Sequence, residues 1–216
     1  LKPIVGVGIQ RSVVPQFVGI TAIFYYSTTL WQTVGFDESQ SFLFSTITAV
    51  TNVAVTFVAI VLVDRVGRRP ILLVGSAGMT VSLAVMAFAF TQSSGSGDNI
   101  SLPDPWGPIA LVAANAFVVF FGASWGPLVW VLLGEMFPNR IRAAALGVAA
   151  MAQWLANFTV TIAFKPALDT FGATVPYTAF AVFAALSFVF VLAKVPETKG
   201  VELEDMGEQP SGRSAH

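Results

Sequence analysis

The chain has 216 residues, of which 55% are apolar and only 11% charged, and its formal net charge is −1. Soluble domains are about a quarter charged, so we expect lipid rather than water to surround most of this chain. The near-zero charge gives no sign of nucleic-acid binding, and the lack of cysteine excludes disulfides and thiolate metal sites. No metal or cofactor is expected, and the nucleophile-and-base pair that an enzyme needs is missing.

Six apolar runs are long enough to be transmembrane helices, since a hydrocarbon core about 30 Å thick requires about 20 apolar residues per crossing. These runs are continuous and lack the alternating pattern of a membrane β-barrel. The sequence therefore predicts an all-α membrane protein, with a six-helix bundle over residues 1–194 and a polar cytoplasmic tail over 195–216. The predicted helices cover residues 4–31, 41–63, 70–92, 108–133, 143–165 and 175–194.

The basic residues predict the orientation, because Lys and Arg are enriched in cytoplasmic loops. Lys165 is the only basic residue predicted on the external side of the bundle. We therefore expect a multi-pass protein of the plasma membrane with both termini in the cytoplasm. A helix begins almost at Leu1 without an initiating Met, so we also expect that residues upstream have been removed. The basic residues assigned to the cytoplasmic side are Lys2, Arg65, Arg68, Arg69, Arg140, Arg142, Lys194, Lys199 and Arg213.

Two of the predicted helices are interrupted at corresponding places. The first contains Pro15 and Gly19, and the fourth contains Gly122, Gly126 and Pro127. Paired interruptions of this kind are typical of a transporter binding site, where bending accompanies gating and the freed backbone groups meet protein or water. The alternative is the ordinary tolerance of membrane helices for proline and glycine.

Four amide side chains are predicted at one depth in the bilayer: Gln16, Asn52, Gln153 and Asn157. A polar side chain in lipid needs a partner, so such residues usually face the bundle interior or an aqueous cavity. Their common depth favours a cavity, whereas hydrogen bonding between helices is the alternative for each one alone. A polar stripe with helical spacing surrounds Asn52 on the second helix and consists of Ser45, Thr48 and Thr56.

Aromatic residues accompany these amides. Trp130 and Trp154 offer flat apolar faces, and a neutral polyhydroxylated ring such as a sugar requires both hydrogen bonds and a stacking surface. Interfacial anchoring is the alternative for Trp130, which lies near a helix end. Tyr25 and Tyr26 could gate the outer side or belong to the outer aromatic belt.

Charged residues are absent from the predicted midplane with one exception. No Asp or Glu lies there, so this chain offers no deeply buried carboxylate to carry a proton. Arg11 is placed about two turns into the first helix, where it could snorkel to the cytoplasm or pair with a carboxylate elsewhere.

Three groups of charges are predicted on the cytoplasmic face. One lies in the turn between the second and third helices, one pairs Glu135 with Arg142 across a loop, and one is Glu197 after the sixth helix. Ion pairs among them would form a latch that closes this face in one conformation. Topology signalling by solvated charges is the alternative. The turn group consists of Asp64, Arg65, Gly67, Arg68 and Arg69.

These residues carry a resemblance to a known family. The chain resembles the C-terminal half of a sugar porter of the major facilitator superfamily, and it is most similar to bacterial xylose/proton symporters and also to facilitative glucose transporters. The match covers essentially the whole sequence. Its motifs stand in family order and are Asp64-Arg-x-Gly67-Arg68-Arg69, Gly126-Pro127-x-x-Trp130, Glu135-x6-Arg142, Gln153-Trp154-Leu-Ala-Asn157 and Pro196-Glu197-Thr198-x-Gly200.

The resemblance implies one half of a twelve-helix transporter, itself a 3+3 inverted repeat, that moves a hexose or pentose by alternating access. Proton coupling is implied by the symporters, whose proton-binding Asp belongs to the other six-helix half. Tyr25 and Tyr26 would lie near the outer gate. The chain departs from the family at Pro15-Gln16 and Thr21, where a Gln-Gln pair and a following Asn are usual. The implied sugar contacts are Gln16, Thr21, Asn52, Trp130, Gln153, Trp154 and Asn157.

Two other functions share these features. A facilitator for a polyol, or for a small organic anion if Arg11 faces the cavity, would use the same fold. A nontransporting sugar sensor would share the motifs as well, although it would ordinarily carry a long cytoplasmic signalling tail, whereas the predicted tail is short.

Overall fold

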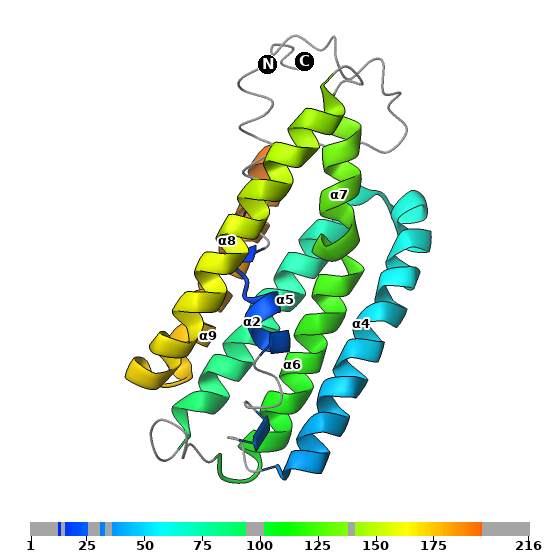
Figure 1. The fold of residues 1–216 in the computed structure, drawn as a ribbon. Helices are drawn as coiled ribbons and strands as arrows, with labels where there is room; N and C mark the ends of the chain where they lie inside the picture. The colour runs from blue at the N-terminus through cyan, green and yellow to red at the C-terminus, as the bar shows by residue number, and fades with distance from the viewer. Residues whose placement is uncertain are drawn as a thin grey trace.

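The computed structural model describes residues 13, 16–25, 31–32, 36–93, 102–137 and 141–195. Within these ranges the chain forms helices and no strand. Consecutive long helices run in opposite directions along the bundle, except that α7 continues in the direction of α6 (Figure 1). The helices are α2 (Ile20–Tyr25), α4 (Glu38–Val66), α5 (Arg68–Thr91), α6 (Trp106–Ala123), α7 (Trp125–Met136), α8 (Arg142–Phe171) and α9 (Thr174–Lys194).

Five spans in the described residues are long and apolar enough to cross a membrane: α4, α5, α6 continued by α7, α8 and α9. Each overlaps one of the predicted helices and begins one to three residues before it. The first predicted helix, 4–31, lies partly outside the described residues, which include α2 and the turn before it. These spans and their composition make the chain a helical membrane protein.

Prolines mark where four of the helices begin. The first turn of a helix has N–H groups without an intrahelical partner, so a residue that lacks an N–H costs nothing there. Proline is the third residue of α5, α6, α7 and α9, at Pro70, Pro108, Pro127 and Pro176 respectively. Pro127 therefore stands in the first turn of α7 and does not kink a longer helix.

The turn between α4 and α5 depends on Gly67. Its φ of 100° and ψ of 161° lie in a region that residues with a side chain rarely adopt, and its N–H donates to the Val63 carbonyl at 3.1 Å. Beside it, Arg69 Nη2 donates to the Leu192 carbonyl at 3.1 Å. Because the last carbonyls of a helix lack partners within it, this contact fastens the turn to the end of α9.

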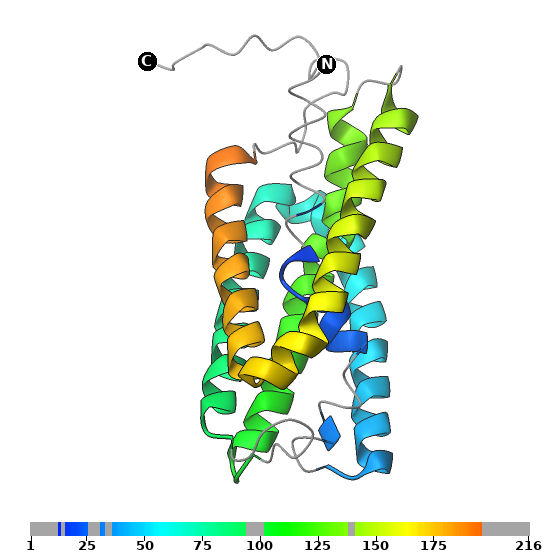
Figure 2. The same cartoon turned by 60° about the vertical axis from the view of Figure 1, so that its left-hand side comes forward.

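Burial is uneven among the spans. Half of the apolar window is buried in α5 and in α6–α7, compared with 17% in α4 and 28% in α8. The main core joins α5, α6 and α9, whereas α4 and α8 run along the outside of the described bundle (Figure 2). Large apolar side chains such as Phe57 and Phe158 are exposed on these two helices. Such faces require lipid or further protein rather than water.

The segment before α2 rests on an aromatic cluster. Gly19 has a φ of 80°, and a Cβ on it would overlap the ring of Phe180 in α9. The Phe180 ring stacks on Phe164 of α8 at 5.8 Å between centroids, and Tyr177 stacks on Phe90 of α5 at 5.1 Å. Only glycine allows the chain to turn at this point and touch the ring, so the cluster sets the depth at which α2 lies.

Replacing Gly67 with alanine should destabilise the protein by about 1–3 kcal/mol, because the new side chain would hold a conformation that glycine adopts freely. The matched control is Gly147→Ala in α8, where a Cβ meets nothing within 4 Å and helix propensity favours alanine. Thermal unfolding of the purified protein in detergent measures both. Equal melting temperatures for the two variants would contradict the role assigned to Gly67.

Candidate functional site

The predicted fourth helix, 108–133, is broken at Ser124, which separates α6 from α7. Several polar groups around the break are nevertheless paired. The Ser124 N–H donates to the Phe121 carbonyl at 3.1 Å, and its hydroxyl donates to the Phe120 carbonyl at 2.6 Å. The Leu128 N–H in turn donates to the Ser124 carbonyl at 3.1 Å.

A second interruption precedes α2. Residues 16–19 form a tight turn in which the Gly19 N–H donates to the Gln16 carbonyl at 3.3 Å. The Ile23 N–H then donates to the Gly19 carbonyl at 2.9 Å, which is the first hydrogen bond of the helical turn that follows. Both interruptions predicted from the proline and glycine positions are thus present in the described residues, and Pro15 lies outside them.

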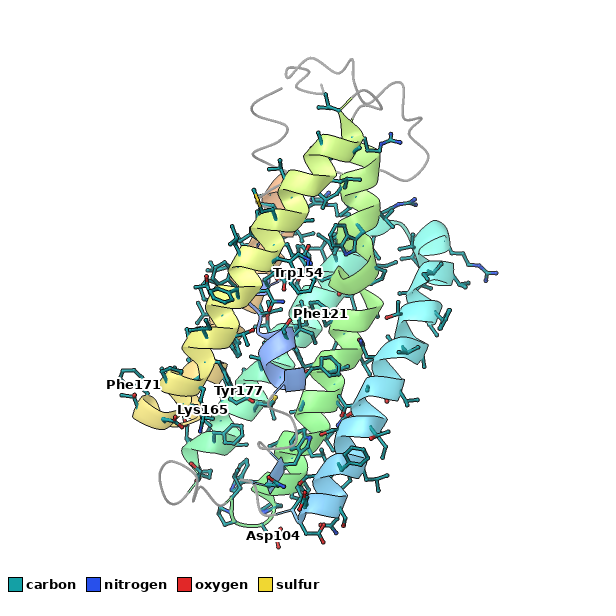
Figure 3. The ribbon with its side chains drawn as sticks, in the orientation of Figure 1. Asp104, Phe121, Trp154, Lys165, Phe171 and Tyr177 are labelled. Atoms are coloured by element: carbon teal, nitrogen blue, oxygen red, sulfur yellow. The ribbon has the colours of Figure 1, made fainter. Side chains whose placement is uncertain are left out.

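A cavity of about 210 Å³ lies beside both interruptions. Three parts of the chain form its wall: the turn and first residues of α2, the segment that crosses the α6–α7 break, and the middle of α8. Figure 3 shows Phe121 and Trp154 at mid-height in the bundle. The lining residues are Gln16, Ile20, Thr21, Phe121, Trp125, Gly126, Val129, Trp130, Gln153, Trp154 and Asn157.

Helical periodicity explains why these side chains share one cavity. On α8, Gln153 and Asn157 are four residues apart and so lie one above the other on one face. The same spacing relates Trp125 to Val129, and Gly126 to Trp130, on α7. Each helix therefore presents one face to the space between α2, α7 and α8.

The amide oxygen of Gln153 is the most informative atom of the wall. Gln153 Oε1 is buried and has no hydrogen-bond partner among the described residues. A buried acceptor without a partner costs about 1–3 kcal/mol, and buried polar atoms in folded proteins are nearly always paired. One turn away, Asn157 Oδ1 accepts from the Thr161 hydroxyl at 3.2 Å. A donor within the cavity, from water or a ligand, would satisfy Gln153.

The cavity is polar but uncharged. None of its lining residues is Asp, Glu, Lys or Arg. Amides and a hydroxyl from three parts of the chain stand beside tryptophan rings, and this combination suits a neutral solute with several hydroxyl groups better than an ion. Arg11, which would matter for an anion, lies outside the described residues.

The structure brings together most of the residues that the sequence singled out for substrate. Gln16, Thr21, Trp130, Gln153, Trp154 and Asn157 all line the cavity, and so does Gly126, which was predicted to act in gating. Their contact with a substrate stays a prediction.

Asn52 is not among the lining residues. It lies on α4, where its Oδ1 would be 2.8 Å from a Cβ at Gly122 of α6. Thr48 of the same polar stripe donates to Asn115 Oδ1 of α6 at 2.9 Å. The stripe thus pairs α4 with α6, because α4 packs against α6 and α7 while the cavity lies on the side of α7 that faces α2 and α8.

Four lining residues were missed by sequence reasoning: Ile20, Phe121, Trp125 and Val129. They are apolar and were indistinguishable from core or lipid-facing residues. The spacing of Trp125 and Val129 relative to Gly126 and Trp130 was a signal that could have found two of them.

The predicted gate and latch are only partly described. Tyr25 ends α2, and its side chain, together with Tyr26, lies outside the described part of the chain. The same holds for the side chains of Asp64 and Glu135 and for Glu197. Arg142 Nε donates to the Phe137 carbonyl at 3.1 Å. The latch therefore stays a prediction.

Most of the helix ends that carry basic residues nevertheless lie at the same end of the bundle. The α4–α5 turn with Arg65 and Arg68, the start of α8 with Arg142 and the end of α9 all lie there (Figure 1). Lys165, which pairs with Asp169 at 2.8 Å, lies at the opposite end with Asp104 (Figure 3).

The chain is similar to known sugar transporters. A model of the family described as sugar (and other) transporter matches residues 3–209. A glucose transport protein of Synechocystis sp. is 50% identical over 206 residues, which cover 95% of this chain and 44% of that protein. A D-xylose-proton symporter of Escherichia coli strain K12 is 35% identical over 211 residues, which cover 94% and 40% of the two chains.

A solved structure gives the same fold. The proton:xylose symporter XylE bound to 6-bromo-6-deoxy-D-glucose superimposes with a TM-score of 0.81 at 34% identity, over 94% of this chain and 42% of that one. The predicted fold, one half of a major facilitator transporter, is thereby confirmed. The chain spans less than half the length of these relatives.

A cysteine placed at Gln153 should react with a small water-soluble thiol reagent, because that side chain faces the cavity. The chain contains no cysteine, so labelling within it has no background. The control is Ala184→Cys in α9, whose side chain is fully buried in the core. Mass spectrometry after timed labelling compares the rates, and equal protection at both positions would contradict a water-accessible cavity.

Proposed function

Because this chain belongs to the sugar (and other) transporter family, we propose that it forms the C-terminal half of a longer transporter that carries a monosaccharide across the membrane. The observation that supports this most directly is the unpartnered Gln153 Oε1 in the wall of a polar, uncharged cavity. A sugar hydroxyl is the donor that this oxygen lacks.

The rest of the wall fits the chemistry of a sugar. Each hydroxyl both donates and accepts, and amide side chains do the same through separate atoms. Gln16 approaches from one side of the cavity, and Gln153 and Asn157 approach from another. The apolar C–H faces of a sugar ring would lie against indole rings such as Trp130 and Trp154.

The cavity has the size of a partial site. Complete ligand pockets measure about 300–1,000 Å³, and this one measures about 210 Å³. Trp130 and Trp154 remain 42% and 67% exposed although they line it. A second six-helix half, which the greater length of the relatives provides for, would cover these rings and complete the site.

Transport would follow from the movement of the two halves about this site. Tyr25, Tyr26, Gly126 and Pro127 would take part in gating, and the charges at the basic end would latch that end closed in one state. We assign the basic end to the cytoplasm and the protein to the plasma membrane, with both termini cytoplasmic, since Lys and Arg concentrate on that side.

Proton coupling completes the proposal. The Escherichia coli relative is named a D-xylose-proton symporter, and the same coupling is proposed for this protein. No described residue of the cavity carries a carboxylate. The proton acceptor would therefore belong to the other half of the transporter.

We expect the complete transporter to accumulate labelled glucose or xylose in cells that lack their own sugar uptake, and an uncoupler to abolish the accumulation. Gln153→Ala should raise KM by about tenfold or more, because it removes a hydrogen bond to the sugar in a desolvated site. Initial rates of uptake, normalised to transporter in the membrane, measure this.

The matched control is Gln92→Ala, which changes an exposed glutamine at the end of α5. Its KM should equal that of the unmodified protein. Uptake of a polyol or a carboxylate in preference to sugars, or no sugar uptake by a protein shown to reach the membrane, would overturn the proposed function.

A further inference from the structure

Trp125 differs from the other two tryptophans of the cavity because it is almost completely buried. Its exposed fraction is 1%, against 42% for Trp130 and 67% for Trp154. It is the first residue of α7, directly after the break at Ser124. Its position is therefore fixed by contacts inside the described bundle.

The indole N–H of Trp125 points away from the cavity. Nε1 donates to the Ser76 hydroxyl of α5 at 2.8 Å, and this bond is buried. Because an indole has only one polar atom, the part of Trp125 that lines the cavity consists of ring carbon. The orientation of this apolar wall is thus set by a serine that does not itself line the cavity.

Ser76 is held in turn by α9. The Ser187 hydroxyl lies 3.1 Å from Ser76 Oγ and 2.7 Å from the Ala184 carbonyl oxygen. Both serines are completely buried. A chain of hydrogen bonds therefore runs from the cavity wall on α7 through α5 to α9, in an interior where an unpaired hydroxyl or N–H would be costly.

The neighbours of Ser76 on α5 allow the break to approach closely. A Cβ at Gly75 would overlap the side chain of Ser124, and a Cβ at Gly78 would overlap the ring of Phe120. Gly75, Gly78 and Ser76 of α5 thus contact the break residue Ser124, the Phe120 ring one turn before it and the tryptophan after it, respectively.

We infer that Ser76, supported by Ser187, is a positioning residue for the binding cavity: it sets the orientation of Trp125 and thereby the affinity for the transported solute. This inference rests on the proposed function for the identity of the solute. The contacts that carry it are independent of which solute that is.

Replacing Ser76 with alanine leaves the buried Trp125 N–H without its acceptor, so the ring should shift in the wall. We expect KM for sugar uptake to rise about two- to tenfold, the range spanned by one hydrogen bond, while the maximal rate per transporter stays within about twofold. Ser76→Thr keeps the hydroxyl and should restore KM. Ser82→Ala, a buried serine of the same helix away from the cavity, should leave KM unchanged.

A double-mutant cycle separates positioning from general destabilisation. In a Trp125→Phe background there is no N–H to satisfy, so Ser76→Ala should cause no further rise in KM. An equal rise in both backgrounds, or an effect of Ser76→Ala on protein yield or maximal rate without a change in KM, would overturn the inference.

A second readout does not depend on sugar. A cysteine at Val129, which lines the cavity one turn after Trp125, should react faster with a thiol reagent when Ser76→Ala is also present, because the wall has loosened. Unchanged labelling would overturn the inference. Failure of uptake in the unmodified transporter together with faster labelling would count against the sugar and in favour of the positioning role.

Discussion

Backbone N–H and carbonyl groups that lie in the hydrocarbon core of a membrane must find partners inside the protein, because lipid offers none. This constraint makes the long spans helical and restricts irregular backbone to protected places. In the two described irregularities, the turn at residues 16–19 and the break at Ser124, the Gly19 and Ser124 N–H groups donate to backbone carbonyls of the same segment. They also flank the same cavity, so the candidate site lies where the helical backbone is interrupted.

Glycines determine how closely other elements approach these irregular places. Gly19 meets the ring of Phe180, Gly75 meets Ser124 at the break, and Gly78 meets the Phe120 ring one turn before it. The resulting contacts place Gln16 on one side of the cavity and Trp125 on another. The cavity wall is therefore backed by close, buried packing of α5 and α9.

The class of fold, the five described spans and most of the cavity residues could be predicted from the sequence, since hydropathy and helical spacing are local properties. Gln153 and Asn157 share a face in any α-helix. The position of Asn52 could not be predicted, because depth in the bilayer does not tell which neighbour a face meets, and this one meets α6. The role of Ser76 depends on a contact with a residue 49 positions away in the chain, which no local pattern records.

We propose that a sugar binds between α2, α7 and α8, where one of its hydroxyls donates to Gln153 Oε1. The decisive experiment is a structure of the complete transporter with glucose or xylose bound. We predict a sugar hydroxyl within about 2.7–3.2 Å of Gln153 Oε1, with the ring against tryptophan faces of α7 or α8. A sugar bound elsewhere, with Gln153 Oε1 paired to protein or still unpaired, would show that this cavity is not the binding site.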